Sequence, residues 1–164
     1  MGMIDPILME IEQESKATRR VLERVPADKL GWTPHPKSYT LGQLALHVAG
    51  IPGHIADAVN GDSFEPRAGA GQPKDHAEIL QTFEQGLTKA KEIYRGMDDA
   101  KLMATWSATV KGKTVMTMPR IGAIRTIALN HLYHHRGQLS VYLRLLDVPV
   151  PMIYGPSADE NPFM

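Results

Sequence analysis

The sequence predicts an all-α protein in which residues 1–164 form a single four-helix-bundle domain. Two observations support this fold class. Four segments have helical character, with apolar residues at helical spacing, whereas almost no segment alternates as a strand does. The expected helix starts also carry capping residues, and the segments between them are rich in proline and glycine. At this length one domain is the default, and 43% hydrophobic residues are enough to build a core.

The first and third helices are predicted from their start signals. Asp5 followed by Pro6 is typical of an N-cap and a first helical position, and Pro26 should end this helix. Asp75 and Glu78 have the spacing that opens the third helix. The expected inward face of the third helix consists of Ala77, Leu80, Phe83, Leu87, Ala90 and Tyr94.

The second helix is predicted from a capping box formed by Thr40 and Gln43. Gly50 and Pro52 interrupt this helix and are expected to kink it. Residues 60–73 are rich in glycine and proline and are expected to form a loop. The inward stripe of the helix consists of Leu44, His47, Val48, Ile51 and Ile55.

The remainder of the chain contains the longest predicted helix. Residues 104–118 alternate weakly around a Lys-Gly-Lys sequence, which indicates a short hairpin between the third and fourth helices. The fourth helix should run from about residue 120 to residue 146. The tail from residue 149 onward contains four prolines and is expected to be extended.

Composition excludes several classes of protein. Lysine plus arginine equal aspartate plus glutamate at 18 each, so the global basic excess of a nucleic-acid-binding protein is absent. No run of about 18 apolar residues suggests a membrane helix, and the N-terminal residues do not resemble a signal peptide. The sequence has no cysteine, which excludes disulfides and thiolate ligands and fits a cytoplasmic protein. A bound metal would therefore need histidine or carboxylate ligands.

Two histidines on the fourth helix indicate a metal site. His131 and His135 lie one helical turn apart on the same side, so both imidazoles can reach one ion. His47 lies on the inward stripe of the second helix and could supply a third ligand if the two helices pack side by side. His54 is about 10 Å further along that helix and is not expected to share the ion. The alternative is that these are hydrogen-bonded core histidines that bind no metal.

Other polar residues of the fourth helix could support the site. Gln138 and Tyr142 continue the stripe of the two histidines, so each could hold a ligand or contact a substrate. Gln138 could equally form a bond across the bundle. His134 lies at the flank, where a surface or interface position is the simpler interpretation. Arg136 and Arg144 are expected on the flank of the helix and could bind an anion, but pairing with the acidic first helix or with a partner subunit is favoured.

Three motifs in the same order resemble the DinB-like superfamily. Segment 131–138 (HLYHHRGQ) is similar to the signature helix of that family. Residues 32–34 and 40–44, followed by His47, resemble a second conserved block, and the tail 148–157 resembles the usual ending. The resemblance covers nearly the whole chain.

The resemblance implies a four-helix bundle with an up-down-down-up arrangement and a metal held by His47, His131 and His135. Relatives commonly form homodimers and, despite the family name, are not regarded as DNA-binding proteins. Some are thiol-dependent transferases or isomerases that use low-molecular-weight thiols. The Gly50-Ile-Pro52 sequence directly after His47 departs from the expected pattern.

These observations together predict a protein that binds a divalent metal, with nickel or zinc expected because imidazole suits both. Three neutral imidazoles would leave the charge of the ion uncompensated and a coordination position open for water or a thiolate. The fourth helix carries no carboxylate, which favours thiol activation over carboxylate-assisted hydrolysis. We therefore expect a metal-dependent enzyme, a thiol-dependent transferase or a hydrolase-like protein, that acts on a small molecule. The alternative is a noncatalytic, stress-related metal- or ligand-binding module of the same fold.

Overall fold

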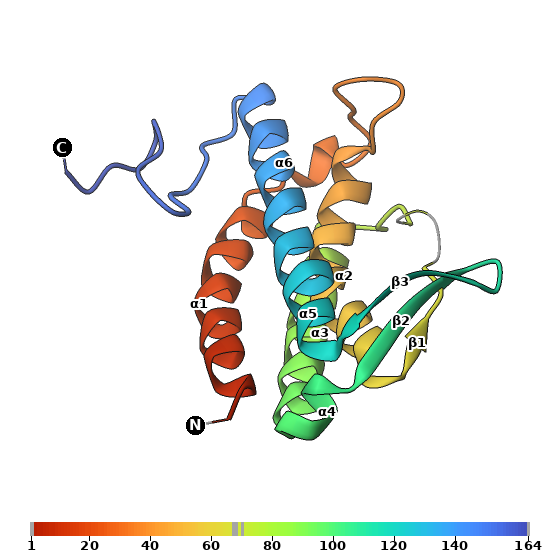
Figure 1. Ribbon diagram of the computed structural model, residues 1–164. Coiled ribbons are helices and arrows are strands. Elements are labelled where there is room, and N and C mark those ends of the chain that lie inside the picture. The colour runs from red at the N-terminus through yellow and green to blue at the C-terminus, as the bar shows by residue number, and fades with distance from the viewer. Residues whose placement is uncertain (1, 67–68, 70, 164) are drawn as a thin grey trace.

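The protein is mostly helical, with four long helical segments packed around one core and a small sheet at one end (Figure 1). The computed structural model describes residues 2–66, 69 and 71–163. The long segments are α1 (Ile4–Glu23), α2 (Leu41–Asn60), α3 (His76–Arg95) and the continuous helical run 120–145. Helix α2 packs against α3 and against the run 120–145, and α1 contacts the same two neighbours. The up-down-down-up order stays a prediction.

Helix α1 begins slightly earlier than the sequence signal indicated. Met3 is the N-cap, so Asp5 lies within the first turn rather than at the cap. Its carboxylate accepts a hydrogen bond from the main-chain N–H of Gly2 at 2.7 Å. Pro6 is still compatible with this position, because the first-turn amides of a helix have no partner within the helix.

Helix α2 is opened by the predicted capping box and continues through its proline. The Thr40 hydroxyl accepts from the Gln43 main-chain N–H at 3.1 Å, and the Gln43 side chain accepts from the Thr40 N–H at 3.0 Å. Pro52 does not end the helix, which extends to Asn60. Gly53 lies against Gly86 of α3, where an added Cβ would be only 2.8 Å from the Gly86 Cα. The glycine therefore permits the close approach of α2 and α3.

Helix α3 has the predicted cap but a slightly different inner face. Asp75 accepts a hydrogen bond from the Glu78 main-chain N–H at 2.8 Å. Ala77 is exposed and Ile79 is buried, so the predicted face was wrong in this first turn. The other predicted positions are buried or partly buried.

The sheet contains the predicted hairpin and one unpredicted strand. Strands β2 (Thr105–Val110) and β3 (Lys113–Pro119) are antiparallel, with Lys111 and Gly112 at positive φ in the turn. Strand β1 (Ser63–Phe64) pairs in parallel with β2, in a region expected to be loop. The all-α prediction is therefore corrected, because the protein also contains a small three-stranded sheet. Residues 67, 68 and 70 of the predicted loop lie outside the described residues.

Short helical elements connect the long ones. They are η1 (Ala27–Lys29) after α1 and α4 (Asp99–Met103) before the sheet. The fourth long segment divides into α5 (Arg120–Ala123), a π-helical turn η2 (Ile124–Asn130) and α6 (His131–Leu145).

Two buried side chains near the sheet, Arg120 and Trp106, donate hydrogen bonds to main-chain carbonyls at the C-terminus of α2. Arg120 is 1% exposed and donates to the carbonyls of Val59 at 2.6 Å and Gly61 at 3.0 Å. The Trp106 indole donates to the Ala58 carbonyl at 2.9 Å. These bonds satisfy carbonyls that a helix end leaves without a partner. They also anchor the start of the helical run that carries His131.

The inner stripe of α6 contains an unexpected buried arginine. The buried residues of this helix are Leu132, Arg136, Leu139 and Leu143. Arg136, predicted on the flank, is 1% exposed and lies 2.7 Å from the Glu14 carboxylate of α1. It also donates to the Tyr154 hydroxyl at 2.6 Å. The favoured alternative, pairing with the acidic first helix, therefore describes Arg136 correctly.

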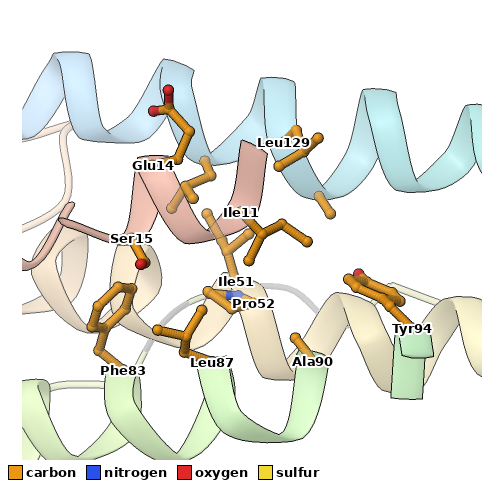
Figure 2. Close-up of a pocket in the computed structure, with 12 residues that line it drawn as sticks. Ile11, Glu14, Ser15, Ile51, Pro52, Phe83, Leu87, Ala90, Tyr94 and Leu129 are labelled. Atoms are coloured by element: carbon orange, nitrogen blue, oxygen red, sulfur yellow. The ribbon is translucent and has the colours of Figure 1, made fainter. Parts of the chain in front are cut away.

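The four long segments enclose a small apolar cavity (Figure 2). Tyr94 is among the residues that line it, and within the described residues its buried hydroxyl has no hydrogen-bond partner. Burial raises the pKa of Tyr94. None of the three predicted metal ligands lines this cavity. Among the described residues, no helix is long and apolar enough to cross a membrane.

Candidate metal centre

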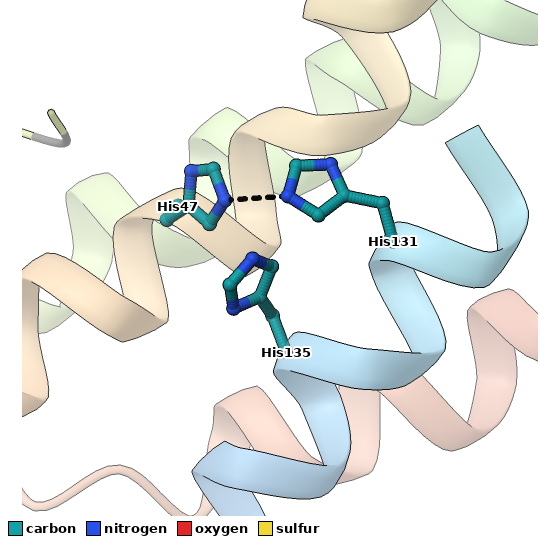
Figure 3. Close-up of side chains that lie close together, drawn as sticks. All are labelled: His47, His131 and His135. Atoms are coloured by element: carbon teal, nitrogen blue, oxygen red, sulfur yellow. Dashed lines mark hydrogen bonds between the residues drawn. The ribbon is translucent and has the colours of Figure 1, made fainter. Parts of the chain in front are cut away.

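Three histidine side chains from two helices converge at the surface between α2 and α6 (Figure 3). His47 comes from α2, and His131 and His135 come from successive turns of α6. One ring nitrogen from each histidine lies within 4.8 Å of the other two. All three side chains are half-buried. The structure therefore brings together the three residues that the sequence predicted as ligands.

The spacing of the nitrogens fits one small ion. The Nε2 atoms of His47 and His131 are 3.2 Å apart. Two imidazole nitrogens at about 2.0–2.1 Å from a tetrahedral zinc ion would be roughly 3.3 Å apart. The ring centroid of His135 lies 4.5 Å from those of both His47 and His131. The donor set therefore suits a metal that accepts imidazole ligands.

Burial keeps the three imidazoles neutral. It is the largest cause that lowers the pKa of His47 to about 4, followed by the neighbouring His135, His131 and His54. Burial is also the main cause that lowers the pKa values of His131 and His135. At neutral pH each ring therefore has one nitrogen with a lone pair, which a metal ligand requires.

One hydrogen bond orients the ring of His135 on α6. The Gln138 side-chain oxygen lies 2.7 Å from Nδ1 of His135, so Nδ1 donates and Nε2 stays free. The main chain of Ile127 partly opposes the lowering effect of burial on the pKa of His131. Gln138 is exposed, and among the described residues its side chain bonds to His135 of the same helix rather than across the bundle.

The other predicted candidates lie around the three histidines without joining them. His134 is exposed, with its ring centroid 4.8 Å from that of His135. Tyr142 donates to the Tyr39 carbonyl at 3.2 Å and packs edge-on against Trp32, with ring centroids 5.7 Å apart. Its contacts fix the segment that precedes α2.

Sequence reasoning missed Tyr39, whose ring centroid lies 6.1 Å from that of His47. The available signal was its position directly before the Thr40 capping box, eight residues before His47. Tyr39 is 37% exposed, and its ring lies beside the three-histidine site.

Acidic side chains do not join the cluster. Within the part of the chain that the structure describes, no carboxylate oxygen completes this group of ligand atoms. Asp57 instead pairs with Lys89 of α3 at 2.6 Å. His54 is exposed and stays outside the group, as predicted. The centre therefore consists of nitrogen donors and has one side toward solvent.

This fold and site define a helical protein of the DinB type, and the chain belongs to the DinB family, whose family model matches residues 3–162. The uncharacterized protein YrdA of Bacillus subtilis (strain 168) is 24% identical over 161 residues, which cover 96% of this chain and 91% of YrdA.

Solved structures of DinB-like proteins share the fold. One from Bacillus cereus ATCC 10987 has a TM-score of 0.71 at 22% identity and covers 90% of this chain and 95% of its own. The DinB-like protein YjoA of Bacillus subtilis has a TM-score of 0.71 at 14% identity, with coverage of 97% and 100%. A member from Exiguobacterium sibiricum 255-15 has a TM-score of 0.64 at 19% identity, with coverage of 93% and 97%.

Proposed function

We propose that this protein binds one divalent metal ion, zinc or nickel, through His47, His131 and His135. The observation that carries the proposal is the convergence of three neutral imidazoles within 4.8 Å on two helices. Gln138 would support the site by holding His135 with Nε2 free.

We further propose that the site is catalytic and acts on a small molecule or a low-molecular-weight thiol. Three protein ligands leave a coordination position open, as in catalytic rather than structural zinc sites. When bound, the ion would lower the pKa of a water molecule to about 7 or stabilise a thiolate. Because no carboxylate of the described residues lies among the ligand atoms, thiol-dependent transfer is favoured over carboxylate-assisted hydrolysis.

The alternative is a noncatalytic metal- or ligand-binding module of the same fold. The half-buried position of the ligands favours the enzyme, because a substrate could approach the open side. A closed ion with a fourth protein ligand would favour the module. No binding to nucleic acid and a cytoplasmic location remain predictions of the sequence.

The test begins with elemental analysis of protein purified without an affinity tag. About one zinc or nickel ion per chain is expected. The proposal would be excluded if the purified protein contains no metal and does not bind added zinc or nickel. The metal-loaded protein is then screened for thiol conjugation beside His135→Ala. Turnover by the wild type alone supports the enzyme, whereas metal binding without turnover across the screen supports the module.

A further inference from the structure

Gly50, one turn after His47 on α2, provides the space in which the ring of His54 lies. The three atoms nearest to an added Cβ on Gly50 all belong to that imidazole, with Cε1 at 2.8 Å, Nδ1 at 3.0 Å and Nε2 at 3.8 Å. Gly50 is buried, whereas His54 is exposed. A side chain at position 50 would therefore displace the ring of His54.

This placement brings the ring of His54 toward the three-histidine centre. His47 and His54 are seven residues apart on α2, so their side chains differ by only about 20° in direction around the helix. Side chains of an α-helix lean toward its N-terminus, which is the direction from His54 to His47. Because the ring lies over Gly50, it is only about 5 Å along the helix axis from the Cα of His47.

The ring of His54 is available to a ligand from solvent. It is exposed, and no hydrogen bond joins its nitrogens to another described residue. It is also outside the group of ligand atoms formed by the other three histidines. The next acidic residue along α2, Asp57, pairs with Lys89 of α3 at 2.6 Å.

The charge of the metal-loaded centre indicates which chemical group His54 would bind. Three neutral imidazoles leave the charge of a divalent ion uncompensated, and no carboxylate of the described residues is among the ligand atoms. The centre would therefore attract anions. A neutral imidazole still has one N–H donor, and hydrogen bonds to a charged acceptor are stronger than those to a neutral one. A carboxylate near the ion satisfies both conditions.

We propose that His54 is a substrate-binding residue, which donates a hydrogen bond to the carboxylate of a small ligand whose thiolate occupies the open coordination position. Gly50 is the positioning residue, because it leaves room for the ring. The inference rests on the proposed function and names the substrate class as thiols with a carboxylate two or three carbons from the sulfur. It also gives a role to Gly50, which departs from the family pattern.

The test uses cobalt(II)-loaded protein, because thiolate coordination to cobalt produces a charge-transfer absorption band. The two probes are 3-mercaptopropionate and 2-mercaptoethanol, which differ in a carboxylate against a hydroxyl group. Each is titrated into the wild type, His54→Ala, Gly50→Ala and the double variant. Gly137→Ala is the matched control for Gly50→Ala, since an added Cβ on this residue of α6 meets nothing within 4 Å.

We expect His54→Ala to lower the affinity for 3-mercaptopropionate about tenfold, through loss of a hydrogen bond to a charged group. The affinities for 2-mercaptoethanol and for cobalt itself should not change, because His54 is not a metal ligand. Gly50→Ala should cause the same selective loss. The double variant should lose no more than His54→Ala, because Gly50 acts through the ring. His54→Gln keeps an N–H donor and should retain part of the preference, and Gly137→Ala should behave as the wild type.

Equal affinities of the wild type and His54→Ala for 3-mercaptopropionate would overturn the proposal and show that the carboxylate binds elsewhere. Losses that add up in the double variant would overturn the role of Gly50. Nuclear Overhauser contacts between the His54 ring and the Gly50 α-protons in the metal-free wild type check the placement independently, and they decide it if Gly50→Ala does not fold.

Failure of the proposed function would give a different result. A wild type that binds no cobalt, zinc or nickel refutes the metal site itself. Cobalt binding without thiolate absorption from either probe refutes the thiol-dependent activity together with the role of His54. Cobalt and thiolate binding that do not depend on His54 refute only the role of His54.

Discussion

The three candidate ligands depend on different parts of the structure. His131 and His135 are one turn apart on α6, so their separation is set by local helix geometry. His47 comes from α2 and reaches the other two only because α2 packs against α6. Removal of one residue of the α6 pair therefore has a different effect from removal of His47.

Replacement of single ligands should lower zinc affinity to different extents. His135→Ala leaves two ligands on different helices and should abolish tight zinc binding. His47→Ala leaves the α6 pair and should retain weak binding. His54→Ala is the control and should keep wild-type affinity, because His54 lies outside the cluster. Competition titrations with a zinc chelator measure these affinities, and equal losses in His54→Ala and His47→Ala would contradict the assignment.

Zinc affinity should decrease as the pH falls, because protons compete for the ligand lone pairs. The pKa of His47 is lowered to about 4, and those of His131 and His135 are also lowered from the ordinary value near 6.5. The decrease should therefore begin below about pH 6.5, where an unperturbed histidine would already be half protonated. Chelator competition across a pH series measures it. A tenfold loss between about pH 8 and 7 would contradict the neutral site.

The same shifts affect the metal-free fold. Because the folded pKa values lie below those of the unfolded chain, these histidines contribute stability that is complete above about pH 6.5. This contribution is lost as the pH falls toward the folded value of His47, about 4.

The sequence was sufficient to predict residue positions that follow from local helix geometry. It was not sufficient for positions that depend on contacts with residues far away in the chain. The His131–His135 pair follows from helical spacing alone, whereas His47 also needed the family resemblance. Arg136 looked like a flank residue because charge favours the surface. Its burial depends on Glu14 and on Tyr154, which lie far away in the sequence.

Helix starts were the most predictable elements because capping is local. The Thr40 capping box and the Asp75 cap are both present. The hairpin was found from its turn sequence. Strand β1 was missed because two residues carry no alternation and form a strand only by pairing with β2. The π turn was missed because a helix predicted from the spacing of apolar residues is assumed to have a constant period of 3.6 residues.

The contact between α2 and α3 should tolerate no side chain at Gly53. An alanine Cβ would lie 2.8 Å from the Gly86 Cα, so the two backbones would have to move apart. Gly53→Ala should destabilise the fold by about 1–3 kcal/mol.

Gly137→Ala is the matched control, since nothing lies within 4 Å of an added Cβ on that residue of α6. It should stabilise the fold by about 0.5–1 kcal/mol through a lower entropic cost of helix formation. Urea unfolding of both variants measures the two changes. A neutral Gly53→Ala would show that the helices are less closely packed.

At the scale of the whole molecule, the tail completes the fold without regular structure. Glu160 pairs with Arg20 of α1, and Asp159 pairs with Arg144 of α6. The proline content predicted an extended segment, but these partners could not be read from the sequence. Which helices are neighbours was equally unreadable, because each apolar face fits several arrangements.

We predict a homodimer, an expectation that comes from the family resemblance. Sedimentation velocity at micromolar concentration measures the assembly state. A single species with the mass of one 18.1 kDa chain would contradict the prediction. The same measurement with and without zinc shows whether assembly depends on the metal.

Metal binding should stabilise the whole bundle because the ion connects α2 to α6. A ligand that binds only the folded state adds about 2.7 kcal/mol at a hundredfold excess over its dissociation constant. For a chain of 164 residues, this corresponds to a rise in melting temperature of about 5–10 °C. In His47→Ala both remaining ligands belong to α6, so the ion no longer connects two helices and the rise should be small. Differential scanning calorimetry with added zinc makes the comparison. If His47→Ala gains as much as the wild type, the third ligand is another residue, with His134 and His54 the next to replace.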